Sequence, residues 1–142
     1  MLILGNERYR DIGLLILRLG IGIMFILHGW PKFIGGPEKW AGLGAYGMGS
    51  LGISFLPTFW GFMAAVSEFF GGIHLVIGLF VRPATFLMMI TMLVAAISHI
   101  VGGDGIMGAS HALESAFVFA SIFAMGAGKY SFDYRFSNQE SI

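Results

Sequence analysis

Four long apolar stretches, each broken by one or two charged or histidine side chains, make up most of the chain. At ~1.5 Å of rise per residue, each stretch is long enough to cross a ~30 Å hydrocarbon layer as an α-helix. Clusters of proline, glycine and arginine separate the stretches and mark their ends. We therefore predict an all-α fold, an integral membrane four-helix bundle that forms a single membrane domain over residues 1–142. Its spans are expected at approximately 12–30, 57–80, 83–101 and 110–127.

The segments outside the spans are short and rich in glycine or aromatic residues. Residues 1–11 form a polar head, and residues 37–54 read PEKWAGLGAYGMGSLGIS. Pro37 followed by Glu38 favours a helix start, and Trp40 and Tyr46 are typical headgroup anchors. This pattern predicts a short interfacial or re-entrant segment between spans one and two, with an irregular loop as the alternative. The tail alternates aromatic and polar residues over 130–136, which favours an interfacial anchor or, as an alternative, a short strand.

Composition narrows the class of protein. The chain is 56% hydrophobic and 11% charged, whereas a soluble domain is about a quarter charged, so much of its surface must face lipid. A net charge of zero argues against a nucleic-acid partner. The chain has no cysteine, which excludes a thiol relay or a zinc-thiolate site made by these residues. No small-residue cleavage site follows the first apolar run, so we expect a retained span rather than a cleaved signal.

The basic residues predict the orientation in the membrane. Lys32 and Lys39 fall on one side of the predicted bundle. Most of the other cations fall on the opposite side: Arg8, Arg10, Arg82, Lys129 and Arg135. Because the more basic side of a membrane protein faces the cytoplasm, both termini are expected to be cytoplasmic.

A carboxylic acid near the middle of span two must have a partner. Placing Glu68 at membrane depth costs ~2.5 kcal/mol or more, so it is expected to face a cation or a wet cavity. Arg18 of span one is the predicted partner. The pair either underlies a ligand pocket, with Glu68 exchanging a proton, or only fixes the register of the helices. His74, among glycines in the same span, favours a hydrogen-bonded packing role over a functional one.

Histidines from three spans are predicted to lie at one level. His28, His99 and His111 each fall about 24–25 Å from the cytoplasmic end of their spans, with Glu114 about one turn deeper than His111. We expect His28, His99 and Glu114 to converge on one cavity. Such groups suit hydrogen bonding to quinone carbonyls and proton transfer near neutral pH. The candidate ligand-binding residues are Arg18, His28, Lys32, Glu68, His99, His111 and Glu114.

Two other interpretations of the level histidines stay open. Histidines on facing helices can bind a metal or the axial positions of a haem, but no helix carries an HxxxH or HExxH spacing, so no metal ligands are assigned. The side chains can also simply extend toward the interface as polar residues at helix ends do. No catalytic residue is assigned, because the chain shows no self-sufficient catalytic motif.

Two segments of the chain resemble the DoxX family. The first is LRLGIGIMFILHGWPKF, with Arg18, His28 and Lys32, and the second is GISFLPTFWGFMAAVSEFFGGIHLVIGLFVRPA, with Glu68 followed by small residues. The resemblance covers roughly residues 12–125. It implies a four-span protein of the prokaryotic inner membrane, with some relatives associated with oxidoreductase systems such as thiosulfate:quinone oxidoreduction. Relatives that use cysteines have no counterpart here, which argues against a thiol relay.

Pattern and resemblance together lead to two hypotheses. The first is a redox-associated membrane subunit that binds quinone or a small amphipathic ligand in a polar bundle core. The alternative is a non-catalytic membrane scaffold or a small-ligand binder or transporter. The expected partner is the lipid bilayer, with a redox partner protein and a homo-oligomer as further expectations. Quinone is the favoured cofactor, and haem or metal is the weaker alternative.

Overall fold

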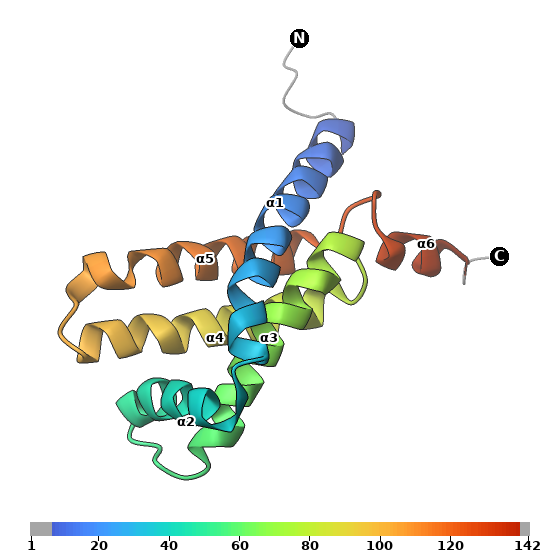
Figure 1. Cartoon of the computed structure of the whole chain (residues 1–142). Helices are drawn as coiled ribbons and strands as arrows, with labels where there is room; N and C mark the ends of the chain where they lie inside the picture. Colours follow the sequence, from blue (N-terminus) through green and yellow to red (C-terminus); the bar gives the residue numbers. More distant parts are fainter. Residues whose placement is uncertain (1–6, 140–142) are drawn as a thin grey trace.

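The computed structural model describes residues 7–139 and contains helices but no strands in that range (Figure 1). Four of the helices are long and apolar enough to cross a membrane, namely α1, α3, α4 and α5. This confirms the predicted all-α membrane fold. In chain order the elements are α1 (Glu7–Phe33), α2 (Gly36–Gly47), the 3-10 helix η1 (Met48–Leu51), α3 (Pro57–Ile77), α4 (Val81–Val101), α5 (Gly105–Met125) and α6 (Phe132–Gln139).

The element boundaries differ from the expected ones mainly at the chain start and before α5. Residues 7–11, expected in a polar head, are the first turns of α1, and residues 1–6 of that head lie outside the described range. Helix α5 begins at Gly105 rather than near residue 110. Glycines and Asp104 at the turn before it end α4 without a long loop.

The four spanning helices form two pairs that cross. Figure 1 shows α4 and α5 side by side, with α1 and α3 forming a second pair at a steep angle to the first. Gly29 of α1 lies against the backbone of α3, where an added Cβ would be 2.5 Å from the Phe69 nitrogen. Small residues allow this close approach of helices in a membrane. The contact sets the register between α1 and α3.

The connection between α1 and α3 is helical and packs on α3. A Cβ on Gly44 of α2 would collide with the carbonyl oxygen of Pro57, so the two backbones are in direct contact. η1 then turns the chain toward α4, where the Ser50 hydroxyl lies 3.0 Å from that of Ser98. The helical interpretation of this segment is confirmed for 36–47, and the irregular-loop alternative is wrong there.

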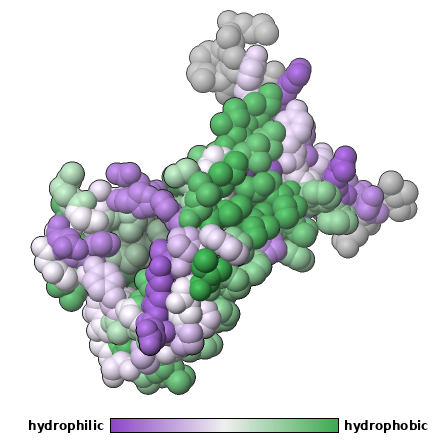
Figure 2. Space-filling model, viewed as in Figure 1, coloured by the Kyte–Doolittle hydropathy of each residue, from purple (hydrophilic) through white to green (hydrophobic). Residues whose placement is uncertain are grey.

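The centre of the molecule is apolar. Its largest buried side chains come from all four spanning helices and include Phe25, Leu75, Met88 and Phe119, with small alanines from α4 and α5 between them. Polar side chains are buried as well, among them Arg18, Glu68 and Ser115, each near the middle of its helix. The outer surface is also apolar. Figure 2 shows a broad apolar surface over α1, with hydrophilic patches toward α2 and toward the two termini.

The tail folds back as a short helix rather than a strand. Residues 126–131 leave α5, and α6 follows with Phe132 and Phe136 in ring contact at 6.3 Å. Both rings are about half exposed, as expected for an aromatic interfacial anchor. The short-strand alternative is therefore wrong, because the aromatic residues four positions apart share one side of a helix.

Candidate functional site: polar side chains at membrane depth

The predicted site residues lie in distinct groups at the two ends of the bundle. We call the end formed by His28, His99 and His111 the histidine end, and the end that carries residues 126–139 the tail end. Arg18 lies at the tail end, and the other candidates lie on the histidine half of their helices. We describe each group in turn.

Lys32 and Glu68 form a buried ion pair between α1 and α3. The Lys32 Nζ atom lies 2.8 Å and 2.6 Å from the two Glu68 carboxylate oxygens, so it donates to both. The Glu68 side chain is 5% exposed, whereas that of Lys32 is 32% exposed. The Glu68 carboxylate is thus enclosed by protein, whereas the Lys32 side chain that pairs with it lies partly at the surface.

The predicted pairing of Arg18 with Glu68 is wrong. The α1–α3 register places Arg18 beside Gly78, where a Cβ would be 2.8 Å from the guanidinium, and Glu68 lies farther along the bundle. Arg18 is fully buried and donates instead to the backbone carbonyls of Ala127 and Tyr130, the latter at 2.7 Å. Arg18 therefore links α1 to the segment that follows α5, and Glu68 pairs with Lys32 instead.

His28 of α1 and His111 of α5 meet at the histidine end. Their ring centroids are 5.8 Å apart in an edge-to-face arrangement. Phe25, one turn below His28, contacts it at 6.3 Å and packs on Phe119 of α5 at 4.9 Å. Both histidines are exposed. The result is an imidazole pair that is open to the surroundings and rests on a buried aromatic floor.

Glu114 lies close to this imidazole pair along α5. It is three residues after His111, and residues with that spacing share a helix face. Its side chain is also exposed. Since His111 is about 9 Å and Glu114 about 14 Å from the Gly105 end of a spanning helix, the helix carries two polar groups at depths where lipid is hydrocarbon.

His99 belongs to a separate group at the loop between α4 and α5. Its Nδ1 atom lies 2.7 Å from the Asp104 carboxylate and 3.3 Å from the Tyr46 hydroxyl. Tyr46, assigned from sequence only to anchoring, therefore contacts a candidate site residue. No pattern in the sequence indicated this contact. The convergence of His28, His99 and Glu114 on one cavity stays a prediction.

His74 has a structural partner near the opposite end of α3. Its Nδ1 atom lies 2.8 Å from the Leu79 carbonyl oxygen, just after the helix ends. The carbonyl requires the imidazole to donate. This contact fits the packing role favoured for His74 from sequence.

Potential metal ligands do not gather in the described part of the chain. Within residues 7–139, no group of three or more histidine, aspartate or glutamate side chains could hold a metal ion. His28 and His111 supply two nitrogen ligands at most. The arrangement is better suited to hydrogen bonding and proton transfer than to metal coordination.

Two aspartates at the tail end carry contacts that the sequence analysis missed. Asp133 accepts hydrogen bonds from the backbone N–H groups of Phe80 and Val81, at 2.7 Å and 2.9 Å, and so caps α4 from a distant segment. Asp11 is buried in α1 and accepts from the Lys129 N–H at 3.3 Å. No local pattern signals these contacts, because each joins residues more than fifty positions apart.

Comparison with known proteins places these features in a family. The sequence profile of the DoxX family matches residues 13–100, which include Arg18, His28, Lys32, Glu68 and His99. The chain is 34% identical to an uncharacterized protein of Haemophilus influenzae over 136 residues, which cover 92% of this chain and 95% of the relative. No solved structure matches the chain.

Proposed function

The chain belongs to the DoxX family of membrane proteins, and on this premise we propose that it is a redox-associated membrane subunit that binds a quinone. The observation that carries the proposal is the contact between His28 and His111, two exposed imidazoles from different spanning helices. The ligand class is that of small amphipathic molecules with a polar ring head and an apolar tail. The site is the imidazole pair together with Glu114.

The exposure of these groups is the first support for a ligand. An ionisable side chain at membrane depth is costly unless something polar covers it. The Lys32–Glu68 pair is covered within the protein. His28, His111 and Glu114 are exposed, so their polar atoms are accessible to a ligand that enters from the bilayer.

The chemistry of the imidazole pair is the second support. A neutral imidazole donates one hydrogen bond and accepts another, so the pair can donate to a quinone carbonyl oxygen. An imidazolium, which forms near neutral pH, can deliver its extra proton to that oxygen and return to the neutral imidazole. The buried Phe25 and Phe119 rings pack beneath the pair, so His28 rests on a firmly packed aromatic base. Conversion of a quinone to a quinol takes two electrons and two protons. We assign the protons to His28, His111 and Glu114, and the electrons to a redox partner protein.

The other candidate residues are proposed to support this site. Lys32 is one helical turn from His28 on the same face of α1, and its pairing with Glu68 fixes α1 against α3. We propose that this pair positions the imidazoles and holds charge near the ligand. His99 is proposed to extend the polar surface toward Tyr46 and Asp104.

A second candidate function is a non-catalytic membrane scaffold. It is favoured by the internal pairing of Arg18, Lys32 and Glu68, because each of these charged groups contacts a partner within the protein. In that case the polar side chains hold the helices together and the imidazole pair binds no redox ligand.

Quinone extracted from purified protein separates the two candidates. We expect mass spectrometry to detect bound quinone in the unaltered protein, and to find much less in His28→Phe and His111→Phe, which keep a ring but lose both nitrogens. His74→Phe is the matched control, because His74 is also in a spanning helix but bonds to the Leu79 carbonyl. Equal quinone per folded molecule in all four proteins would favour the scaffold.

We also propose that the protein lies in the prokaryotic inner membrane with both termini in the cytoplasm. The cations outside the spans support this orientation, since the tail end carries the larger number. Because the chain has no cysteine, single cysteines at Gly49 and Asn138 give clean labels for an impermeant thiol reagent. We expect Gly49→Cys to react in intact cells and Asn138→Cys only after the membrane is opened. The reverse pattern would contradict the orientation.

A further inference from the structure

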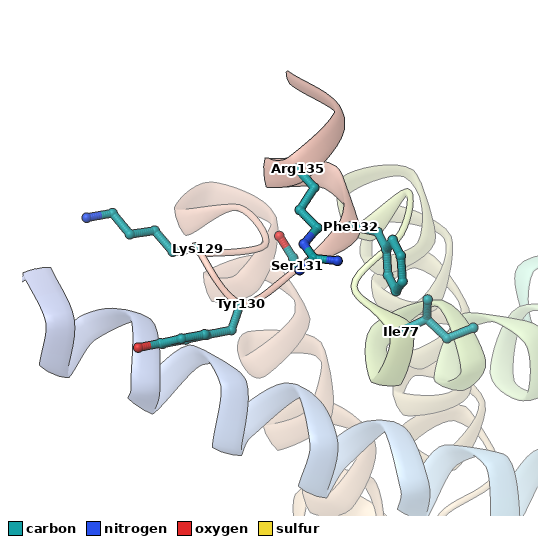
Figure 3. Close-up of a pocket in the computed structure, with 6 residues that line it drawn as sticks. All are labelled: Ile77, Lys129, Tyr130, Ser131, Phe132 and Arg135. Atoms are coloured by element: carbon teal, nitrogen blue, oxygen red, sulfur yellow. The ribbon is translucent and has the colours of Figure 1, made fainter. Parts of the chain in front are cut away.

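Two cavities lie side by side at the tail end, far along the bundle from the imidazole pair. They have volumes of about 300 Å³ and 390 Å³ and share Ser131. Figure 3 shows the smaller one, which lies between the end of α3 and the start of α6. We call it the tail crevice. It is lined by Ile77, Lys129, Tyr130, Ser131, Phe132 and Arg135.

Charge distinguishes the tail crevice from its neighbour. The larger cavity has Arg82 and Asp133 in its lining, so both signs are present. Among the described residues, the lining of the tail crevice has two cations and no acid. It therefore favours an anion, while the neighbouring cavity does not.

Arg135 is the cation available to a ligand. The Lys129 ammonium lies 3.3 Å from Glu7, and in Figure 3 its side chain points away from Arg135. In Figure 3 the Arg135 side chain lies over Ser131 and beside Phe132, and Lys129 extends in the opposite direction. Within residues 7–139 the Arg135 guanidinium has no hydrogen-bonding or acidic partner. No residue of that range satisfies the five donors of this planar group, so it is available at the crevice.

The crevice lies at the expected level of lipid headgroups. Ile77 is the last residue of the spanning helix α3 and is 43% exposed, and Phe132 at the start of α6 is 44% exposed. Exposed aliphatic and aromatic side chains at the end of a spanning helix mark the boundary between hydrocarbon and water. An anion from the headgroup layer can enter the crevice without leaving that layer.

We propose that the tail crevice binds a phosphate group, and that at this level the phosphate is that of an anionic phospholipid. The Arg135 guanidinium matches phosphate oxygens with two parallel donors. Basic pockets beside spanning helices are suited to such headgroups. The acyl chains would lie along Ile77 and Phe132. A volume of about 300 Å³ is at the lower end of small-ligand sites, which suits a headgroup rather than a whole lipid.

Native mass spectrometry of the full chain in neutral detergent tests this proposal. The protein is titrated with dioleoyl phosphatidylglycerol and, separately, with dioleoyl phosphatidylcholine. We expect the unaltered protein to retain phosphatidylglycerol in preference to phosphatidylcholine. In Arg135→Gln we expect about five-fold weaker binding of phosphatidylglycerol, because one cation near a membrane surface contributes about that factor to the affinity for an anionic lipid. Arg82→Gln is the matched control, because it removes an exposed arginine that lines the neighbouring cavity. Arg135→Lys keeps the positive charge but loses the two parallel donors of the guanidinium. Its affinity for phosphatidylglycerol should lie between those of the unaltered protein and Arg135→Gln.

The source of the phosphate is tested in a second arm with millimolar inorganic phosphate. Failure of phosphate to displace the lipid supports the phospholipid as the natural ligand. Displacement that requires Arg135 supports the phosphate site and assigns it to free phosphate. Equal lipid retention by Arg135→Gln and Arg82→Gln, or equal retention of the two lipids by the unaltered protein, would overturn the proposal.

Discussion

The two ends of the bundle use polar side chains in different ways. At the tail end, Arg18 donates to the carbonyls of Ala127 and Tyr130, and Asp133 accepts from the N–H groups at the start of α4. At the histidine end, side chains meet other side chains, as in Lys32 with Glu68 and His28 with His111. The first set binds the backbone, and the second does not.

This difference separates structural polar groups from available ones. Helix termini leave backbone N–H and C=O groups without helical partners, and at the tail end the buried charges satisfy those groups. Much of their bonding capacity is used by the fold, and among the described residues the Arg18 Nε and Asp11 Oδ2 atoms are the buried side-chain atoms without a hydrogen-bond partner. At the histidine end the imidazoles and Glu114 are exposed and keep capacity for a ligand. Substitutions of the buried charges at the tail end should therefore reduce stability, and those among the exposed histidines should reduce binding.

Removing the cation of the buried ion pair should have the largest effect on stability. In Lys32→Met, the enclosed Glu68 carboxylate loses its partner, which should cost about 3–5 kcal/mol of unfolding free energy. Glu68→Gln should cost less, because the third-exposed Lys32 can extend toward water. Denaturant titration in detergent micelles measures both.

A double variant is the control for this prediction. Lys32→Met with Glu68→Leu removes both charges, so it should be more stable than Lys32→Met alone. If the losses of the two single changes simply add, Lys32 and Glu68 are not energetically coupled, and the histidine end has no buried ion pair.

Removing Arg18 should have the next largest effect. Arg18→Met leaves two carbonyls without a charged donor, and bonds of this kind contribute about 1.5–3 kcal/mol each. Because the substitution also removes the cost of burying the guanidinium charge, we expect a net loss of about 2–4 kcal/mol. Hydrogen exchange should also rise over residues 127–139 before the rest of the chain. The control is Arg10→Met, since Arg10 is exposed. Unchanged exchange in the tail would show that Arg18 does not hold it.

Removing the cap of α4 should have a moderate effect. Phe80 has a left-handed backbone with φ of 52°, and Asp133 bonds to its N–H and to that of Val81. Asp133→Ala should cost about 0.5–2 kcal/mol, as the loss of an N-cap does, and Asp133→Asn much less. Thermal melting of the unaltered protein, Asp133→Ala and Asp133→Asn gives the order of their stabilities. Equal stability of the alanine and asparagine variants would contradict capping by the side chain.

Substituting His99 should have the smallest effect on stability. His99→Phe loses a contact with the exposed Asp104, and a surface pair of this kind contributes about 0–1 kcal/mol. If the convergence predicted from sequence is right, bound quinone per folded molecule nevertheless falls. A stability loss as large as that of Arg18→Met, with unchanged quinone, would make His99 a structural residue like those of the tail end.

Several features of the fold could be read from the order of residues. Apolar stretches of spanning length require helices, because a backbone in lipid must satisfy its own hydrogen bonds. Glu68 in such a stretch requires a cation, and the chain offers few. The level of His28 and His111 also follows from helix rise, and the structure brings these two together.

The partners of the charges depended on how the helices are packed. From helix rise alone, both Arg18 and Lys32 could reach Glu68, since long side chains extend along the axis. The choice depends on the register of α1 against α3, which the contact of Gly29 with the Phe69 backbone sets. In that register Glu68 forms its ion pair with Lys32, and Arg18 lies beside Gly78 and the tail.

The sequence by itself determined that the chain is an all-α membrane protein with polar groups at defined depths, because length and hydropathy act locally along each helix. Only the tertiary structure decided which of those groups meet. It pairs Arg18 with the tail rather than with Glu68, makes Asp133 the cap of α4, and gives the Arg135 guanidinium no partner within residues 7–139. These outcomes depend on contacts between distant residues, and a helix pattern holds no information about its neighbours' rotation or register.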